Sequence, residues 1–140
     1  MKNTNILSLS IFLIALLANS SFANGNDNNR IITPNAIQNL KAGLQSENIG
    51  LKKHCIYFAG KYKLNQVYDE LKEQYKKENN ISLKRLILVS MYEIKNENSE
   101  RDFYKLAISE KNKKLKSIAA AAYLQLNISD SLKYYSKLNK

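Results

Sequence analysis

Apolar residues recur at helical spacing along this 140-residue chain, and the pattern repeats at a fixed interval, the step from Asn48 to Asn80 and again to Asn112. We call this step the repeat interval. The segments that begin at these asparagines read NIGLKKHCIYFAGKYK, NISLKRLILVSMYEIK and NKKLKSIAAAAYLQLN. Each has a favourable N-cap asparagine, a leucine at the third position after it, and shared apolar positions at the fourth, eighth and eleventh places beyond that leucine, on one helical face. The positions expected to be buried are Leu51, Leu83 and Leu115; Cys55, Ile87 and Ala119; Ala59, Met91 and Tyr123; and Tyr62, Ile94 and Leu126.

A second helix is predicted to follow each first one. Apolar residues share one face of LNQVYDELKEQYKKE, and Leu71, Phe103 and Tyr135 are again separated by the repeat interval. Gly60 in the first segment is expected to let a neighbouring helix approach closely. The face of the second helix consists of Leu64, Val67, Leu71 and Tyr75. Caps for its later copies are available at Asn98 or Ser99, and at Ser129 or Asp130.

The repeating unit is therefore a helical hairpin. Neither helix of a hairpin can bury its apolar face alone, so stacked hairpins must supply a continuous core, as in a solenoid. The chain has only 4 Gly and 1 Pro, which is too few turn residues for an all-β fold. We expect an all-α fold, a short α-α superhelix of about seven helices. The domain is expected to span residues 34–140, with a half repeat over 34–47 that starts at Thr33-Pro34 and repeats over about 48–79, 80–111 and 112–140.

Three stretches resemble the HEAT-like repeats of small exported bacterial proteins: SENIGLKKHCIYFAGKYK, ENNISLKRLILVSMYEI and KKLKSIAAAAYLQL. The resemblance covers roughly residues 36–126 and depends most on SEN-G-KK, the Gly in FAGKYK and KR-LILVSMYEI. The proline and aspartate common in eukaryotic HEAT units are absent, and armadillo-like hairpins or TPR-like hairpins, with a unit of about 34 residues, are neighbouring classes. The resemblance implies an α-α superhelix that binds proteins and has no catalytic residues.

The first 23 residues have the pattern of a cleaved secretory signal peptide, with Lys2, an apolar run over residues 6–17 and the small-x-small step that ends at Ala23. The run is shorter than the roughly 20 residues that span a bilayer. An uncleaved anchor is the alternative, because no charge occurs between Lys2 and Asp27. Residues 24–33 are polar and are expected to form a disordered leader. We therefore expect a periplasmic or secreted protein.

The chain is strongly basic, with a formal net charge of +10, and removal of residues 1–23 takes away only one positive charge. In an exported protein this charge argues against nucleic acid as the partner. It favours anionic envelope polymers, lipid headgroups or acidic proteins. The alternative is a bias toward Lys and Asn from genome composition, in which case the charge is only solvated surface.

His54 and Cys55 are the only histidine and cysteine, and they are neighbours. Successive helical residues point about 100° apart, so the two side chains diverge and cannot readily share a proton or a metal ion. No further Cys or His is present to complete a zinc site. The alignment places Cys55 in the core and His54 at the edge of the buried face. Without a nucleophile, base and orienting residue, we expect no enzymatic activity, no cofactor and no metal.

Basic residues recur directly after the aligned leucines. Packed helices lie about 8–10 Å apart, so these charges are expected to form a row across the repeats. A cation in the first turn of a helix opposes the macrodipole, which favours a functional use, although a solvated lysine copied with the repeat is the alternative. Some tyrosines fall off the buried stripes and suit a protein interface. The candidate partner-binding residues are Lys52, Lys53, Lys84, Arg85, Lys116, Tyr68 and Tyr104.

These patterns predict a non-enzymatic exported scaffold that binds an unidentified protein partner through its second helices and its basic edge. The alternative is a protein that binds an anionic envelope surface or anionic lipid by net charge alone. Such binding would collapse at a few hundred millimolar salt. The C-terminal SLKYYSKLNK is only partly polar for a terminal cap, so we expect a monomer or a weak homo-oligomer.

Overall fold

The computed structural model describes residues 32–138, and every regular element within this range is helical. The expected signal peptide, and all but the last two residues of the expected leader, lie outside the described residues. Six α-helices pack side by side, and one short 3-10 helix precedes α4. The elements are α2 (Pro34–Leu44), α3 (Ile49–Lys61), η2 (Asn65–Val67), α4 (Tyr68–Lys77), α5 (Ile81–Ile94), α6 (Ser99–Ser109) and α7 (Lys113–Leu138).

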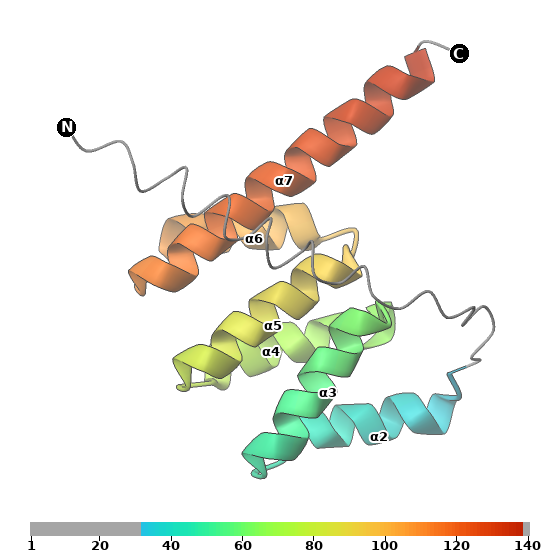
Figure 1. Ribbon diagram of the computed structural model, residues 1–140, viewed down its shortest axis with the longest axis vertical. Coiled ribbons are helices and arrows are strands. Elements are labelled where there is room, and N and C mark those ends of the chain that lie inside the picture. Colours follow the sequence, from blue (N-terminus) through green and yellow to red (C-terminus); the bar gives the residue numbers. More distant parts are fainter. Residues whose placement is uncertain (1–31, 139–140) are drawn as a thin grey trace, which may run out of the picture. The chain divides into compact units, whose positions relative to one another are not determined.

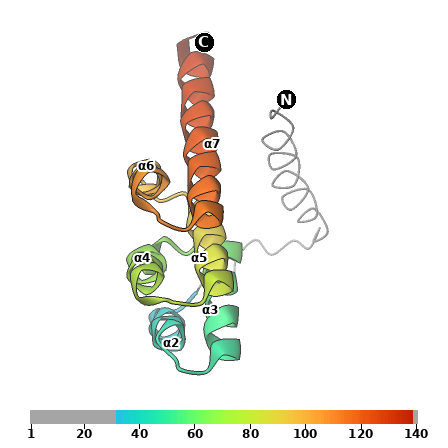
Figure 2. The ribbon, with the colours of Figure 1, turned by 90° about the vertical axis from the view of Figure 1, so that its left-hand side faces the viewer.

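The helices form two layers, with α2, α4 and α6 in one and α3, α5 and α7 in the other (Figure 2). Sequential helices pack as the pairs α2–α3, α4–α5 and α6–α7, and these pairs lie one above the other (Figure 1). Within the second layer, α5 contacts both α3 and α7. None of the helices in the described part of the chain is long and apolar enough to cross a membrane.

Four helix starts follow the predicted caps, whereas α6 has its N-cap at Asn98, one of the two predicted residues, without a side-chain capping hydrogen bond. Asn48, Asn80 and Asn112 each accept a hydrogen bond at Oδ1 from the backbone N–H three residues on, at 3.0, 3.2 and 3.2 Å. Thr33 caps α2 in the same way, and Pro34 stands at its first position. These bonds satisfy N–H groups that have no partner within the helix. The N-capping prediction is confirmed at all four starts.

The helix α7 continues past the point where the repeat predicted an end, so residues 32–138 form six α-helices rather than about seven. Lys63 and Lys95 adopt positive φ angles of 51° and 52° and turn the chain out of α3 and α5. Asn127, one repeat interval after Lys95, lies inside α7 instead, and neither Ser129 nor Asp130 begins a new helix. A left-handed residue costs about 1–2 kcal/mol. Packing of α4 on α5 and of α6 on α7 offsets this cost, and no further helix within the described range follows α7 to do so.

The aligned apolar positions form the core with three exceptions. Nine of the twelve are buried, but Leu51 and Tyr62 on α3 are exposed and Tyr123 on α7 is half-buried. Leu51 and Tyr62 belong to the first helix of their layer, and no earlier helix among the described residues covers them. The helical face was therefore predicted correctly, and its exposure depends on the position of the helix in the stack.

Gly60 lies at a close approach of α3 to α5. A Cβ atom at this position would stand 2.8 Å from Ser90 Cα, a distance that requires the backbone to shift. The Ser90 hydroxyl donates to the Ile56 carbonyl oxygen at 2.8 Å, which fixes the two helices together by a direct bond. The predicted close approach at Gly60 is confirmed.

Candidate partner-binding surface

Two lysines of the predicted row make contacts within the fold. Lys52 Nζ lies 3.5 Å from Glu78 Oε2, and the Lys52 side chain is only 14% exposed. Lys84 Nζ lies 4.5 Å from the centre of the Tyr75 ring. Tyr75 and Glu78 stand at the C-terminal end of α4, so both lysines tie the first turn of a helix in one layer to α4 in the other. These partners offset the unfavourable position of a cation in a first helical turn.

The third lysine is also engaged. Lys116 Nζ donates to the carbonyl oxygen of Ile108 at 2.9 Å, which satisfies a carbonyl near the C-terminal end of α6. Lys53 and Arg85, which stand beside the row in sequence, are exposed. The amines at the repeated position therefore serve contacts of the fold, and the predicted basic residues that are exposed are Lys53, Arg85 and Lys116.

Glu78 and Glu110 stand at equivalent positions, directly after the ends of α4 and α6, and connect each helix to the next one. Each accepts a hydrogen bond from the N-cap asparagine of the next helix: Asn80 N–H at 2.9 Å and Asn112 N–H at 2.8 Å. The Tyr75 hydroxyl also donates to Glu110 Oε2 at 2.5 Å. Partial burial acts to raise the pKa of Glu110, but these hydrogen bonds outweigh it and the pKa is lowered. The Asn80 hydrogen bond is the main reason that the pKa of Glu78 is lowered.

Tyr68 is a core residue rather than part of a binding surface. It is 1% exposed, and burial raises the pKa of its hydroxyl to about 12. Tyr68 is the first residue of α4 and lies three and seven residues before Leu71 and Tyr75, so it shares their buried face. The assignment of Tyr68 to a partner-binding surface is therefore wrong.

His54 and Cys55 have separate surroundings. Cys55 is buried, as predicted, and burial raises the pKa of its thiol. His54 is exposed instead of lying at the edge of the core, and its Nδ1 is 2.9 Å from the carbonyl oxygen of Gly50. No group of three or more His, Cys, Asp or Glu within the described range is placed to hold a metal ion.

Tyr104 is the predicted tyrosine that faces solvent. It lies on α6 and is 50% exposed. Its ring packs against that of Tyr123 on α7, with centroids 5.3 Å apart and planes tilted by 53°. Such tilted ring pairs add to the stabilisation from burial alone. The two rings thus form a fixed aromatic surface where α6 meets α7.

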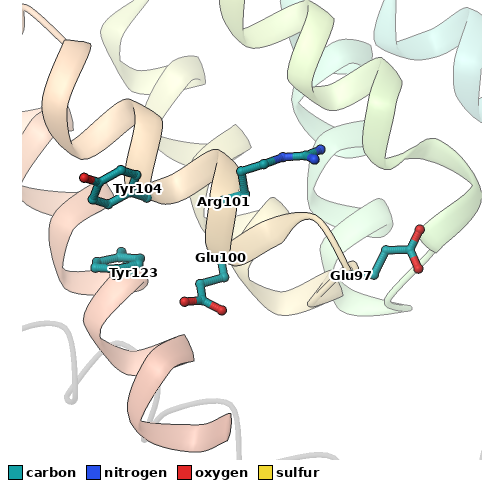
Figure 3. Close-up of a pocket in the computed structure, with 5 residues that line it drawn as sticks. All are labelled: Glu97, Glu100, Arg101, Tyr104 and Tyr123. Atoms are coloured by element: carbon teal, nitrogen blue, oxygen red, sulfur yellow. The ribbon is translucent and has the colours of Figure 1, made fainter.

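A shallow, open hollow of about 380 Å³ surrounds this ring pair (Figure 3). We call it the tyrosine hollow. Its two carboxylates and one guanidinium give the lining a single net negative charge, on a chain whose net charge is positive. Aromatic faces beside carboxylates can accept a cationic or polar side chain. The lining residues are Glu97, Glu100, Arg101, Tyr104 and Tyr123.

Hydrogen bonds fix two of the charged groups of the tyrosine hollow, Arg101 and Glu100. Arg101 Nη2 donates to Asn98 Oδ1 at 2.9 Å, just before the start of α6. Glu100 Oε1 accepts from Asn127 Nδ2 at 3.1 Å, which links α6 to α7. The hollow is therefore formed by side chains that already have defined positions, a property that reduces the entropy lost on binding.

The sequence indicated only part of this site. Tyr104 was predicted, but Tyr123 was assigned to the core because its alignment with Ala59 and Met91 predicts a buried position. Glu100 and Arg101 lie four and three residues before Tyr104 on the same helix, so their proximity could have been found from helical spacing. Their contact with α7 depends on the angle between two helices and has no sequence signal.

Comparisons with family models, with curated proteins and with solved structures found no match to this chain. The functional assignment therefore depends on the residues and their geometry.

Proposed function

We propose that this chain is a non-enzymatic, exported scaffold of HEAT-like repeats that binds a protein partner at the tyrosine hollow. The observation that carries the proposal is the Tyr104–Tyr123 ring pair, in which Tyr104 is exposed and Tyr123 half-buried, held by packed helices and flanked by charged groups. Tyrosine is enriched among the residues that dominate binding energy at protein interfaces.

Features that recur at the repeat interval support the repeat part of the proposal. They include the three asparagine caps, the left-handed turns at Lys63 and Lys95, and the junction carboxylates Glu78 and Glu110. Stacked hairpins present a rigid surface assembled from successive units, which suits recognition of another protein.

The lining of the tyrosine hollow favours a partner segment that offers a basic or polar side chain. Glu100 provides a carboxylate near the two rings, and Glu97 lies at the far side of the hollow (Figure 3). A lysine or arginine could stack on a ring while pairing with Glu100. A partner attracted only by the net positive charge of the chain would not favour the tyrosine hollow, because the lining of the hollow has a net negative charge.

The test is quantitative affinity purification of the tagged protein from cells that produce it. Tyr104→Ala is expected to reduce the captured partner on the order of tenfold or more, because truncation of a hot-spot tyrosine at the centre of an interface costs about 2 kcal/mol or more. Tyr57→Ala is the matched control, since Tyr57 is equally exposed at 50% but lies on α3. It should leave capture unchanged.

Raising the salt concentration separates this proposal from the electrostatic alternative. Binding at the tyrosine hollow should persist at a few hundred millimolar salt, where surface charges are screened within about 3–8 Å. Capture that is lost in salt and is indifferent to Tyr104→Ala would instead support attachment to an anionic envelope surface.

A further inference from the structure

The side of α5 that faces α3 is buried, and the same side of α7 is buried as well. On α5 it includes Ser90, which packs against Gly60 of α3. The buried residues on this side are Leu83, Ser90 and Ile94 of α5, and Leu115, Ala122 and Leu126 of α7. The two sets are separated by the repeat interval, so α5 and α7 bury the same repeat positions.

On α3 the equivalent positions are uncovered. Leu51, Phe58 and Tyr62 are 49%, 41% and 38% exposed. Phe58 also stacks with the rings of Tyr57 and Tyr62, at centroid distances of 5.9 and 6.0 Å. We call Leu51, Phe58 and Tyr62 the N-terminal end patch. It is a prearranged apolar surface at positions that are buried on α5 and α7.

The opposite end of the same layer is also apolar. Leu124 and Ile128 of α7 are 59% and 55% exposed, and we call them the C-terminal end patch. Leu124 is the equivalent of Gly60, the residue through which α3 meets the next helix of the layer. No charged residue occurs over residues 117–129. The patch therefore occupies the place where a further helix of the layer would pack.

We propose that the N-terminal end patch of one copy docks on the C-terminal end patch of another, which continues the α3–α5–α7 layer from chain to chain. Stacked helical repeats need polar terminal faces to stay monomeric, and neither end of this layer has one. The contact would reproduce, between copies, the helix packing that already joins α3 to α5 and α5 to α7. Because it joins two different surfaces, each copy can bind one neighbour at each end, so assembly continues beyond a dimer.

Charge and chain length favour a second copy as the occupant. Lysines border the N-terminal end patch, whereas the C-terminal end patch lies in an uncharged stretch, so like charges do not oppose one another. Residues 24–31, the part of an exported chain that would precede the described helices, are mostly polar and could not bury an apolar face. The proposal does not depend on the partner at the tyrosine hollow.

The test measures mass against concentration by sedimentation velocity for residues 24–140. This form is used because the apolar run of residues 6–17 would associate by itself, and residues 32–138 contain their own core. Wild-type protein should form species that grow beyond a dimer as concentration rises. Phe58→Asp and Leu124→Asp each disable one end, so each variant alone should remain at the mass of one chain. Ile108→Asp, an exposed position on α6, is the control and should associate like the wild type.

Mixing the two end variants decides the geometry. Each retains the end that the other has lost, so an equimolar mixture of Phe58→Asp and Leu124→Asp should form a dimer and nothing larger. Formation of that dimer also shows that both variants are folded. The proposal is overturned if wild-type protein stays monomeric at every concentration, if Leu124→Asp alone still dimerises, or if the mixture stays monomeric. A monomer that binds phosphatidylglycerol vesicles through Phe58 would identify lipid as the occupant and overturn it too.

Discussion

At the scale of single residues, the close packing of α3 on α5 depends on the absence of a side chain at Gly60. The sequence predicted a close approach there, but the neighbour, Ser90, lies on another helix far along the chain and could not be predicted from the local pattern. Burial followed the alignment at Cys55, whereas Tyr68, which was assigned to the surface, is buried. Tyr68 lies three residues before Leu71 and seven before Tyr75, so its burial could have been predicted from helical spacing.

Gly60→Ala is expected to destabilise the protein by about 1–3 kcal/mol, because the added methyl group forces α3 away from α5. The free energy of unfolding, measured by urea titration, checks this. Gly50→Ala is the control, since a Cβ there meets only Asn48 Oδ1 at 3.2 Å and alanine favours a helix. Equal stability of the Gly60→Ala variant and the wild type would contradict the close packing.

Asp102 on α6 is 4% exposed, and both of its carboxylate oxygens accept hydrogen bonds from Lys72 Nζ on α4, at 3.0 and 2.9 Å. Lys72→Met should lower the free energy of unfolding by about 3 kcal/mol, because it leaves a buried carboxylate without its cation. Lys76→Met is the matched change at an exposed pair with Glu73 and should cost about 0–1 kcal/mol. Both free energies of unfolding are measured by urea titration. Similar decreases in the two variants would show that the buried pair stabilises the protein no more than the exposed pair.

At the scale of helices, starts were easier to predict than ends. An N-cap depends on one side chain and a backbone group three residues away, so Asn48, Asn80 and Asn112 could be read from sequence. The ends at Lys63 and Lys95 are left-handed turns formed by lysine, which has no special preference for them. They form because the following helix has a partner to pack on, and this information is absent from the local sequence. The same reasoning accounts for the unbroken α7.

The junction between α6 and α7 should make stability depend on pH. Because the pKa of Glu110 is lowered in the folded protein, its stabilising effect is fully present above the ordinary carboxyl value of 4.5 and is lost as the pH falls through the lowered value. In the Glu110→Gln variant, the free energy of unfolding should fall by about 1 kcal/mol less on acidification than in the wild type. The effect is small because the carboxylate is partly solvent-exposed. Unfolding measured from pH 7 to pH 3 checks this, and an unchanged pH profile would argue against the Tyr75–Glu110 contact.

At the scale of the whole molecule, the sequence predicted the helices and most of the buried face, but not their pairing. The expected hairpins join α3 to α4 and α5 to α6, whereas the sequential helices that pack together are α2–α3, α4–α5 and α6–α7. It did not predict which ends of the stack remain exposed, because exposure of Leu51 and Tyr62 depends on the lack of a neighbouring helix in the described part of the chain rather than on the residues themselves. The contacts of the lysine row were missed for a related reason. Lys52 and Glu78 are far apart in the sequence, and only the packing of α3 beside the end of α4 brings them together.

The central claim is that the partner binds at the tyrosine hollow, and site-specific photo-crosslinking in cells that produce the protein tests it most directly. A benzophenone amino acid replaces Tyr104 in one sample and Lys105, the exposed next residue of α6, in another. We expect one protein to be crosslinked from position 104 and little or none from position 105, with a lower yield when Tyr123→Ser is added. No adduct from position 104, or equal adducts from both positions, would contradict the account.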